Sequence, residues 1–138
     1  MDRPEGRNAA IELHDSVLLS TDQDDAGLVA VLSAYVHRSE GEPGVHRGTG
    51  WSQTAALHVA RGVCSPRAVL PMNLADGTLD ANGSRFSNVI PAPRVFQGPI
   101  RMTLTGFDGA IVVIQGDRLE VRLEGTARFI ERFEPDGP

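Results

Sequence analysis

The sequence predicts an all-β protein, either an antiparallel β-sandwich or a closed β-barrel of about 8–10 strands, with little or no helix. The strongest observation lies between residues 100 and 133, where apolar side chains recur at every second position and short Gly/Asp turns separate the runs. This alternation is typical of an antiparallel meander with one buried face. In addition, 15 Gly and 9 Pro are spread through the 138 residues, which suits a fold with many turns.

The first part of the chain predicts short strands followed by one long strand. Residues 1–8 are charged and contain Gly and Pro, so we expect a loose leader there. Residues 10–13 and 17–19 alternate as short strands, and residues 21–27 form an Asp-rich turn that ends at a glycine. Residues 28–37 then predict a long strand. Because both of its faces carry apolar side chains, we expect this strand to be central in the sheet.

Segment 51–61 allows two interpretations, and it follows a Gly-rich loop at residues 38–50. As a helix, the segment would have Ser52 as its N-cap and Gly62 as its C-terminal stop. As a strand, it would place alternate apolar side chains on one face. The surrounding pattern is strand after strand, so we favour the strand.

The rest of the chain predicts further strands and turns. Residues 73–87 contain two tight-turn dipeptides, Asp76-Gly77 and Asn82-Gly83. Residues 88–99 contain prolines, which cannot donate to a sheet ladder, so we expect an edge strand or a crossover that slightly favours the sandwich. The last strands are expected at residues 100–105, 110–114 and 119–123, with turns at 106–109 and 115–118 and a frayed tail at 134–138.

Composition indicates a single soluble domain spanning residues 1–138. The apolar share of 41% and the charged share of 22% are ordinary for a globular chain. No run approaches the roughly 20 apolar residues that a membrane helix needs. The polar N-terminus does not resemble a secretory signal, so we expect a cytoplasmic protein.

Charge argues against a nucleic-acid partner. All 13 basic residues are Arg, which a GC-rich bacterial genome explains simply, and the formal net charge is −5. The arginines are scattered among acidic neighbours, whereas nucleic-acid binding depends on a basic stripe. The single cysteine, Cys64, excludes an intramolecular disulfide and fits a small buried residue.

One candidate site for chemistry is a metal centre at His14, Asp15 and His37. If the strands that carry these residues are neighbours, the two histidines could approach each other, with Asp15 as a third ligand or as an orienting group. Zinc and iron sites use such sets of imidazole and carboxylate ligands. The spacing of the histidines matches no metal motif, and ordinary hydrogen bonding is the simpler interpretation.

The second candidate site is a ligand-binding site around the loop 38–50. Arg38 and Arg47 could pair with an anion, and the glycines of the loop could let backbone amides approach it. Trp51 and Gln53 follow the loop and Tyr35 precedes it, so these three residues complete the predicted ligand-binding set. The loop does not match the phosphate-binding loop of nucleotide-binding proteins.

The sequence therefore favours a binding module over an enzyme, since it contains no nucleophile motif and no paired carboxylates in a recognisable site. We expect a bacterial β-domain that binds a small ligand or a protein partner. Two alternatives stay open: a metal-dependent enzyme using His14, Asp15 and His37, and a structural subunit of a homo-oligomer, such as a homodimer formed through a sheet edge. The cofactor, if the protein uses one, is unknown from the sequence.

Overall fold

The computed structural model describes residues 8–66 and 69–134 as nine strands without a helix, which confirms the all-β prediction and the expected number of strands. The strands are β1 (Asn8–Gln23), β2 (Gly27–Ser39), β3 (Gly48–Ala60), β4 (Val63–Ser65), β5 (Met72–Ala81), β6 (Ser84–Ser87), β7 (Val89–Pro91), β8 (Arg94–Gly106) and β9 (Ile111–Phe133).

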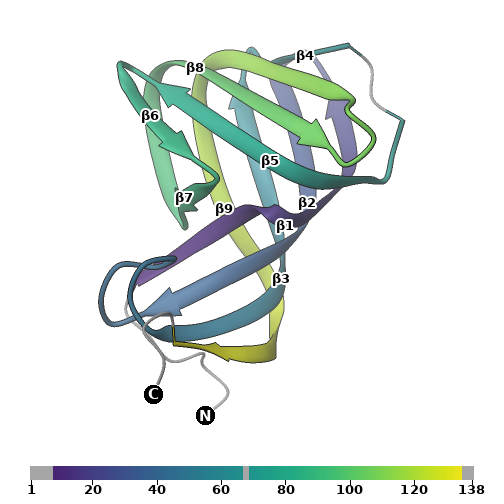
Figure 1. Cartoon of the computed structure of the whole chain (residues 1–138). Coiled ribbons are helices and arrows are strands. Elements are labelled where there is room, and N and C mark those ends of the chain that lie inside the picture. Colours follow the sequence, from purple (N-terminus) through teal and green to yellow (C-terminus); the bar gives the residue numbers. More distant parts are fainter. Residues whose placement is uncertain (1–7, 67–68, 135–138) are drawn as a thin grey trace.

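Six strands form a ring of antiparallel hydrogen-bonded pairs in the order β1, β2, β3, β9, β8 and β5, which is seen in the upper part of Figure 1. A short pairing of β1 with β5 closes the ring, through Val17 opposite Asn73 and Leu18 opposite Met72. Strands β6 and β7 lie at the two ends of the sheet path, and β4 pairs with β9. One curled sheet therefore forms the fold. The sequence allowed a sandwich or a closed barrel, and the ring corresponds to the closed arrangement.

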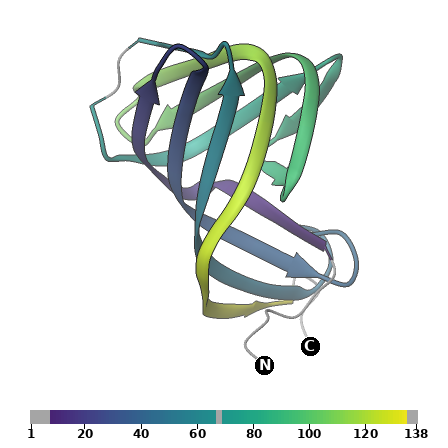
Figure 2. The ribbon, with the colours of Figure 1, turned by 180° about the vertical axis from the view of Figure 1, so that it is seen from behind.

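Four strands of the ring continue beyond it and form a second part that we call the lower sheet. It consists of residues 8–12 of β1, 35–39 of β2, 48–52 of β3 and 128–133 of β9, with β7 beside β1. Figure 2 shows these strands passing from the ring into the lower sheet, where they cross at a different angle.

Two bulges, at a level that we call the waist, separate the ring from the lower sheet. Opposite Ala34 of β2, β1 carries the extra residues 13–16. Opposite Gln53 of β3, β9 carries the extra residues 125–127. Ala34 and Gln53 are paired with each other, so both bulges lie at one level of the sheet. Because extra residues bend a strand and increase its twist, we infer that the bulges redirect the lower sheet.

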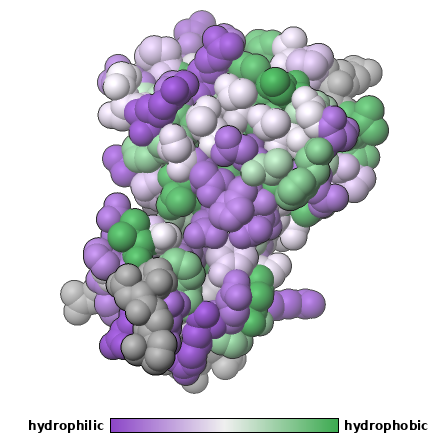
Figure 3. Space-filling view, in the orientation of Figure 1, coloured by the Kyte–Doolittle hydropathy of each residue, from purple (hydrophilic) through white to green (hydrophobic). Residues whose placement is uncertain are grey.

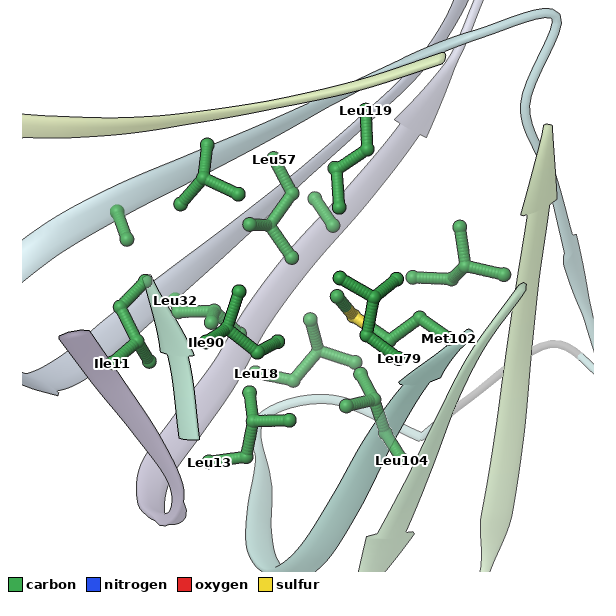
Figure 4. Packing of buried hydrophobic residues seen from close by; sticks show 14 of the residues in the cluster. Ile11, Leu13, Leu18, Leu32, Leu57, Leu79, Ile90, Met102, Leu104 and Leu119 are labelled. Carbon is green, nitrogen blue, oxygen red and sulfur yellow. The ribbon is translucent and has the colours of Figure 1, made fainter. Parts of the chain in front are cut away.

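The hydrophobic core fills the ring. Leu18 of β1, Leu57 of β3 and Leu119 of β9 are no more than 1% exposed. Figure 4 shows these side chains converging with Leu79 of β5 and Met102 of β8. Complete burial of one such side chain is worth about 1.5–3 kcal/mol relative to exposure, so the ring is where the fold gains most of its stability.

Two glycines that predicted turns lie inside strands instead. The turn expected at residues 115–118 is not formed, because β9 is one continuous strand through Gly116. A Cβ on Gly116 would lie 2.8 Å from the Ala60 carbonyl oxygen, so this glycine permits close approach of β3. Gly77 similarly lies inside β5, where a Cβ would be 3.1 Å from the Leu13 Cβ. Glycine is needed at both positions because a neighbouring strand approaches closely, and not because the chain turns there.

Other sequence predictions are confirmed. Residues 51–60 lie in the strand β3, so the strand interpretation of this segment was right. Residues 28–37 lie in β2, which is flanked by β1 and β3 as expected for a central strand. Asn82 and Gly83 form the turn between β5 and β6, with φ values of 46° and 89°.

The expected leader at residues 1–8 lies outside the described residues except for Asn8, which already belongs to β1. Of the expected tail, only Glu134 is described, and it directly follows β9.

Within residues 8–66 and 69–134, the structure contains no helix of the length and apolar character needed to cross a membrane.

Candidate functional site

The bulge of β1 holds two of the residues predicted to bind a metal, His14 and Asp15. Asn88, between β6 and β7, accepts a hydrogen bond from the His14 backbone N–H through its Oδ1 atom at 2.7 Å. The Nδ2 atom of the same amide contacts His14 Nδ1. On the other side of the ring, His14 Nε2 lies 3.0 Å from Asp15 Oδ2. Each ring nitrogen of His14 therefore has its own polar neighbour.

These contacts determine which ring nitrogen of His14 carries hydrogen. The Oδ1 atom of Asn88 accepts from the backbone, so the Nδ2 group must donate to His14 Nδ1. The neutral ring then carries its hydrogen on Nε2, where Asp15 accepts it. Both ring nitrogens of His14 are then hydrogen-bonded, and these bonds hold the bulge in place. The lone pair of Nδ1, which a metal ion or a substrate would need, is already occupied by Asn88.

Glu12 is an additional ligand candidate that was not among the predicted metal ligands. One potential ligand atom from each of Glu12, His14 and Asp15 lies within 4.8 Å of the others. Glu12 stands two residues before His14, a spacing that places both on one face of an extended strand and could have indicated the pair. His37 is not a member of this group, so the metal site of His14, Asp15 and His37 stays a prediction.

His37 is completely buried in the lower sheet and contacts the loop between β2 and β3. Its Nδ1 atom accepts a hydrogen bond from the Gly44 backbone N–H at 2.8 Å and lies 3.6 Å from Glu12 Oε1. Its ring packs edge-on against Phe133 with a centroid distance of 4.5 Å. In the described part of the chain, His37 thus holds the loop against the sheet.

Two glycines of β3 make room for rings that belong to β2. A Cβ on Gly48 would lie 2.9 Å from His37 Nε2, and a Cβ on Gly50 would lie 3.0 Å from Tyr35 Cε2. These glycines were expected to open backbone amides to a ligand, but on this face the protein's own side chains fill the space. Tyr35, one of the predicted ligand-binding residues, therefore lies on the face away from the arginines described next.

On the other face of the lower sheet, Arg38, Thr49 and Arg132 form a row across three strands. Thr49 of β3 is paired with Arg38 of β2 and with Arg132 of β9. Residues paired directly in antiparallel strands share a face, with Cβ atoms about 4.5–5.5 Å apart. The two arginines therefore flank the Thr49 hydroxyl, and their Cβ atoms are about 10 Å apart.

This row opens into a depression of about 490 Å³ at the end of the lower sheet. The loop between β2 and β3 contributes Arg47 and His46 to its lining. We call this site the arginine depression and define it by five side chains that can donate hydrogen bonds: Arg38, His46, Arg47, Thr49 and Arg132. The carboxylates of Glu40 and Glu134 also line it, so its charge is mixed but contains three guanidinium groups.

The three arginines of the depression form no ion pair within the residues that the structure describes. Nε of Arg38 is buried and has no hydrogen-bond partner among those residues. Burial also lowers the pKa of the Arg38 guanidinium from its ordinary value. Other arginines contact carboxylates at 2.8–3.0 Å, namely Arg61, Arg85 and Arg122.

The two uncharged donors of the depression, Thr49 and His46, each accept a hydrogen bond from a neighbouring group. Thr49 Oγ1 accepts a hydrogen bond from Trp51 Nε1 at 2.8 Å, so its own hydroxyl hydrogen can be donated. His46 Nδ1 accepts from the Glu42 backbone N–H at 2.7 Å, so the neutral ring carries its hydrogen on Nε2. Ser39 Oγ donates to the Arg47 carbonyl oxygen at 2.7 Å and fixes the base of the loop.

Trp51 and Gln53, which were predicted to bind a ligand, do not line the depression but contact two residues that do. Trp51 holds Thr49 and packs edge-on against Phe129 at a centroid distance of 5.4 Å. Gln53 accepts from Arg38 Nη2 at 3.4 Å and donates to the Gly125 carbonyl oxygen in the β9 bulge at 3.1 Å. Of the predicted set, Arg38 and Arg47 thus line one site, and Trp51 and Gln53 position its groups.

Arg132 and His46 are members of the site that sequence reasoning missed. Arg132 is more than 80 residues from Arg47, and only the pairing of β3 with β9 brings them to one end of the sheet. The sequence contained no signal for this pairing. His46 lay inside the selected loop and could have been chosen on that ground.

Exposed apolar side chains do not gather into one patch on the face shown in Figure 3, where hydrophilic residues cover the waist.

Along its outer side, β9 has no strand partner in the described structure beyond Val121, where pairing with β8 ends. The β9 bulge interrupts this free edge, a device that discourages edge-to-edge pairing.

Comparisons with known proteins identify no relative: no family model, no curated protein and no solved structure matches the chain.

Proposed function

We propose that this protein is a binding module that takes a small anionic ligand in the arginine depression. The observation that carries the proposal is that Arg38, Arg47 and Arg132 line one depression and that none of them has a carboxylate partner among the described residues. A guanidinium group donates to an oxyanion through a rigid fork, and such charge-assisted bonds are among the strongest in proteins.

The size of the site supports a small ligand rather than a macromolecule. Its volume of about 490 Å³ lies within the range of roughly 300–1,000 Å³ that is usual for small-molecule sites. The carboxylate of Glu134 at its lining would repel a ligand with negative charge along its whole length, but would tolerate one anionic group held among the arginines.

The depression is preferred over the enzyme alternative because of the state of its polar groups. The ring of His14 is already satisfied by Asn88 and Asp15, which leaves it poorly suited to act as a base or as a metal ligand. Nε2 of His37, like Nε of Arg38, has no described partner, but His37 is completely buried, whereas Arg38 lines the depression. The function we infer is therefore recognition of a ligand without chemical conversion.

A thermal-shift screen in low-salt chloride buffer tests the proposal. The panel contains carboxylates, sulfate, phosphate and phosphate esters, with the uncharged parent alcohols and amides as controls. A ligand present at 100 times its Kd stabilises a native protein by about 2.7 kcal/mol, so a hit should raise the Tm in proportion to the logarithm of its concentration.

Variants locate the site of any hit. We expect Arg38→Gln and Arg132→Gln to abolish the shift, while Arg128→Gln keeps it. Arg128 is the matched control because it is paired with Ser52 on the same strand pair but lies on the opposite face from Arg132. The proposal fails if no anion raises the Tm, or if the Arg38 and Arg132 variants respond like the unmodified protein.

A further inference from the structure

We infer that the group recognised in the arginine depression is a phosphoryl dianion, as free phosphate or as a phosphate monoester, rather than a carboxylate. This inference rests on the proposed function and specifies its ligand class.

The residues that line the depression carry more side-chain donors than one carboxylate can accept. Arg38 and Arg132 flank Thr49 in one row, and Arg47 and His46 approach from the loop. A carboxylate has two oxygens with about four lone-pair sites, all in one plane. Two guanidinium forks would already saturate it, and the Thr49 hydroxyl and the His46 Nε2–H would be left without an acceptor.

A phosphoryl group matches the donors of the depression both in its shape and in its number of acceptor oxygens. It carries about −1.5 to −2 charges at neutral pH and three acceptor oxygens directed away from one another. Three oxygens directed apart could be shared among the donors of the row and those of the loop. The tetrahedral shape also suits donors that come from a sheet on one side and a loop on the other.

The neutral donors distinguish this site from a general attraction of charges. Trp51 Nε1 occupies a lone pair of Thr49, so the hydroxyl hydrogen is the part of Thr49 left for a ligand. The Glu42 backbone N–H occupies Nδ1 of His46 and leaves the Nε2 hydrogen for the same purpose. Both groups are therefore set as donors, as an oxyanion with several acceptors requires.

Calorimetric titration of the full chain with matched probes tests the inference. The probes are inorganic phosphate, a phosphate monoester, the corresponding phosphate diester and a dicarboxylate whose charge equals that of the monoester. We expect phosphate or the monoester to bind at least tenfold more tightly than the dicarboxylate and the diester. The tighter of the two phosphoryl probes identifies whether the source is free phosphate or an ester.

A conservative pair of variants tests the role of the hydroxyl. Thr49→Val keeps the size of the side chain but removes the donor, and we expect roughly tenfold weaker binding of the phosphoryl probe, as for loss of a hydrogen bond to a charged group. Thr49→Ser keeps the hydroxyl and should bind nearly as well as the unmodified protein. Equal loss in both variants would contradict the role of the hydroxyl.

The outcomes separate this inference from the proposed function. If the dicarboxylate or the diester binds as tightly as the phosphoryl dianions, the phosphoryl inference is overturned and anion binding stands. If none of the probes binds, both the inference and the proposed function fail.

Discussion

The hydroxyl of Tyr35 on β2 donates a hydrogen bond of 2.8 Å to Glu131 Oε2 on β9, although β3 lies between these two strands. The contact exists because Gly50 of β3 is paired with Glu131 and has no side chain. The Tyr35 ring occupies the space above this glycine, where a Cβ would be 3.0 Å from its Cε2 atom. One missing side chain thus lets two strands that are not neighbours interact directly.

Replacing Tyr35 by phenylalanine should destabilise the protein by about 0.5–1.5 kcal/mol at pH 7, the usual net value of one hydrogen bond. Burial, and then the hydrogen bond to Glu131, raises the pKa of the Tyr35 hydroxyl above its ordinary value. A group whose pKa is raised on folding stabilises the native state below its unfolded pKa, which is about 10 for tyrosine. The difference between the two proteins should therefore persist to about pH 10 and shrink above it.

Urea unfolding of both proteins at pH 7, 9 and 10.5 measures this difference. The chain contains one Tyr and no Lys, so phenolate absorbance follows Tyr35 alone and no lysine titration interferes. A midpoint at the ordinary tyrosine value in the folded protein would contradict the proposed burial and hydrogen bond.

Gly50→Ala should destabilise the fold by about 1–3 kcal/mol, the usual cost of overpacking, because the new methyl group would collide with the Tyr35 ring. The double variant Tyr35→Ala with Gly50→Ala checks the cause. If the collision is responsible, the alanine at position 50 should cost much less once the ring is gone. Equal cost in both backgrounds, measured by urea unfolding, would exclude the ring as the reason.

Leu18 and Leu19 are adjacent in β1 and provide a matched pair for the core. Leu18 is fully buried, whereas Leu19 is 44% exposed. We expect Leu18→Ala to cost about 2–5 kcal/mol and Leu19→Ala less than about 0.5 kcal/mol. Circular dichroism during urea unfolding gives both values, and similar costs at the two positions would mean that the alternation of buried and exposed faces is wrong.

Gln53→Leu should weaken binding of an anion in the arginine depression by roughly threefold to tenfold, since it removes the acceptor that holds the Arg38 guanidinium. Gln115→Leu is the control, because Gln115 lies on the exposed outer side of β9 and does not line the depression. Calorimetry reports the affinity, and urea unfolding reports stability separately. A loss of stability with unchanged affinity would show that Gln53 only supports the β9 bulge.

The sequence by itself determined the local character of the chain. Alternating apolar residues fixed the strands, since side chains of a strand point by turns to opposite faces. The pattern at residues 28–37, apolar on both faces, also indicated the central place of β2. Arg38 and Arg47 could be selected for an anion because a guanidinium group has the same chemistry in any fold.

The tertiary structure decided what lies beside what. Gly77 and Gly116 have the same sequence signature as turn glycines, and only the approach of Leu13 and Ala60 shows that they permit packing inside strands. Arg132 joins Arg38 because two pairings in succession place Thr49 between them. Such register depends on the sum of many contacts along paired strands, and no short stretch of sequence records that sum.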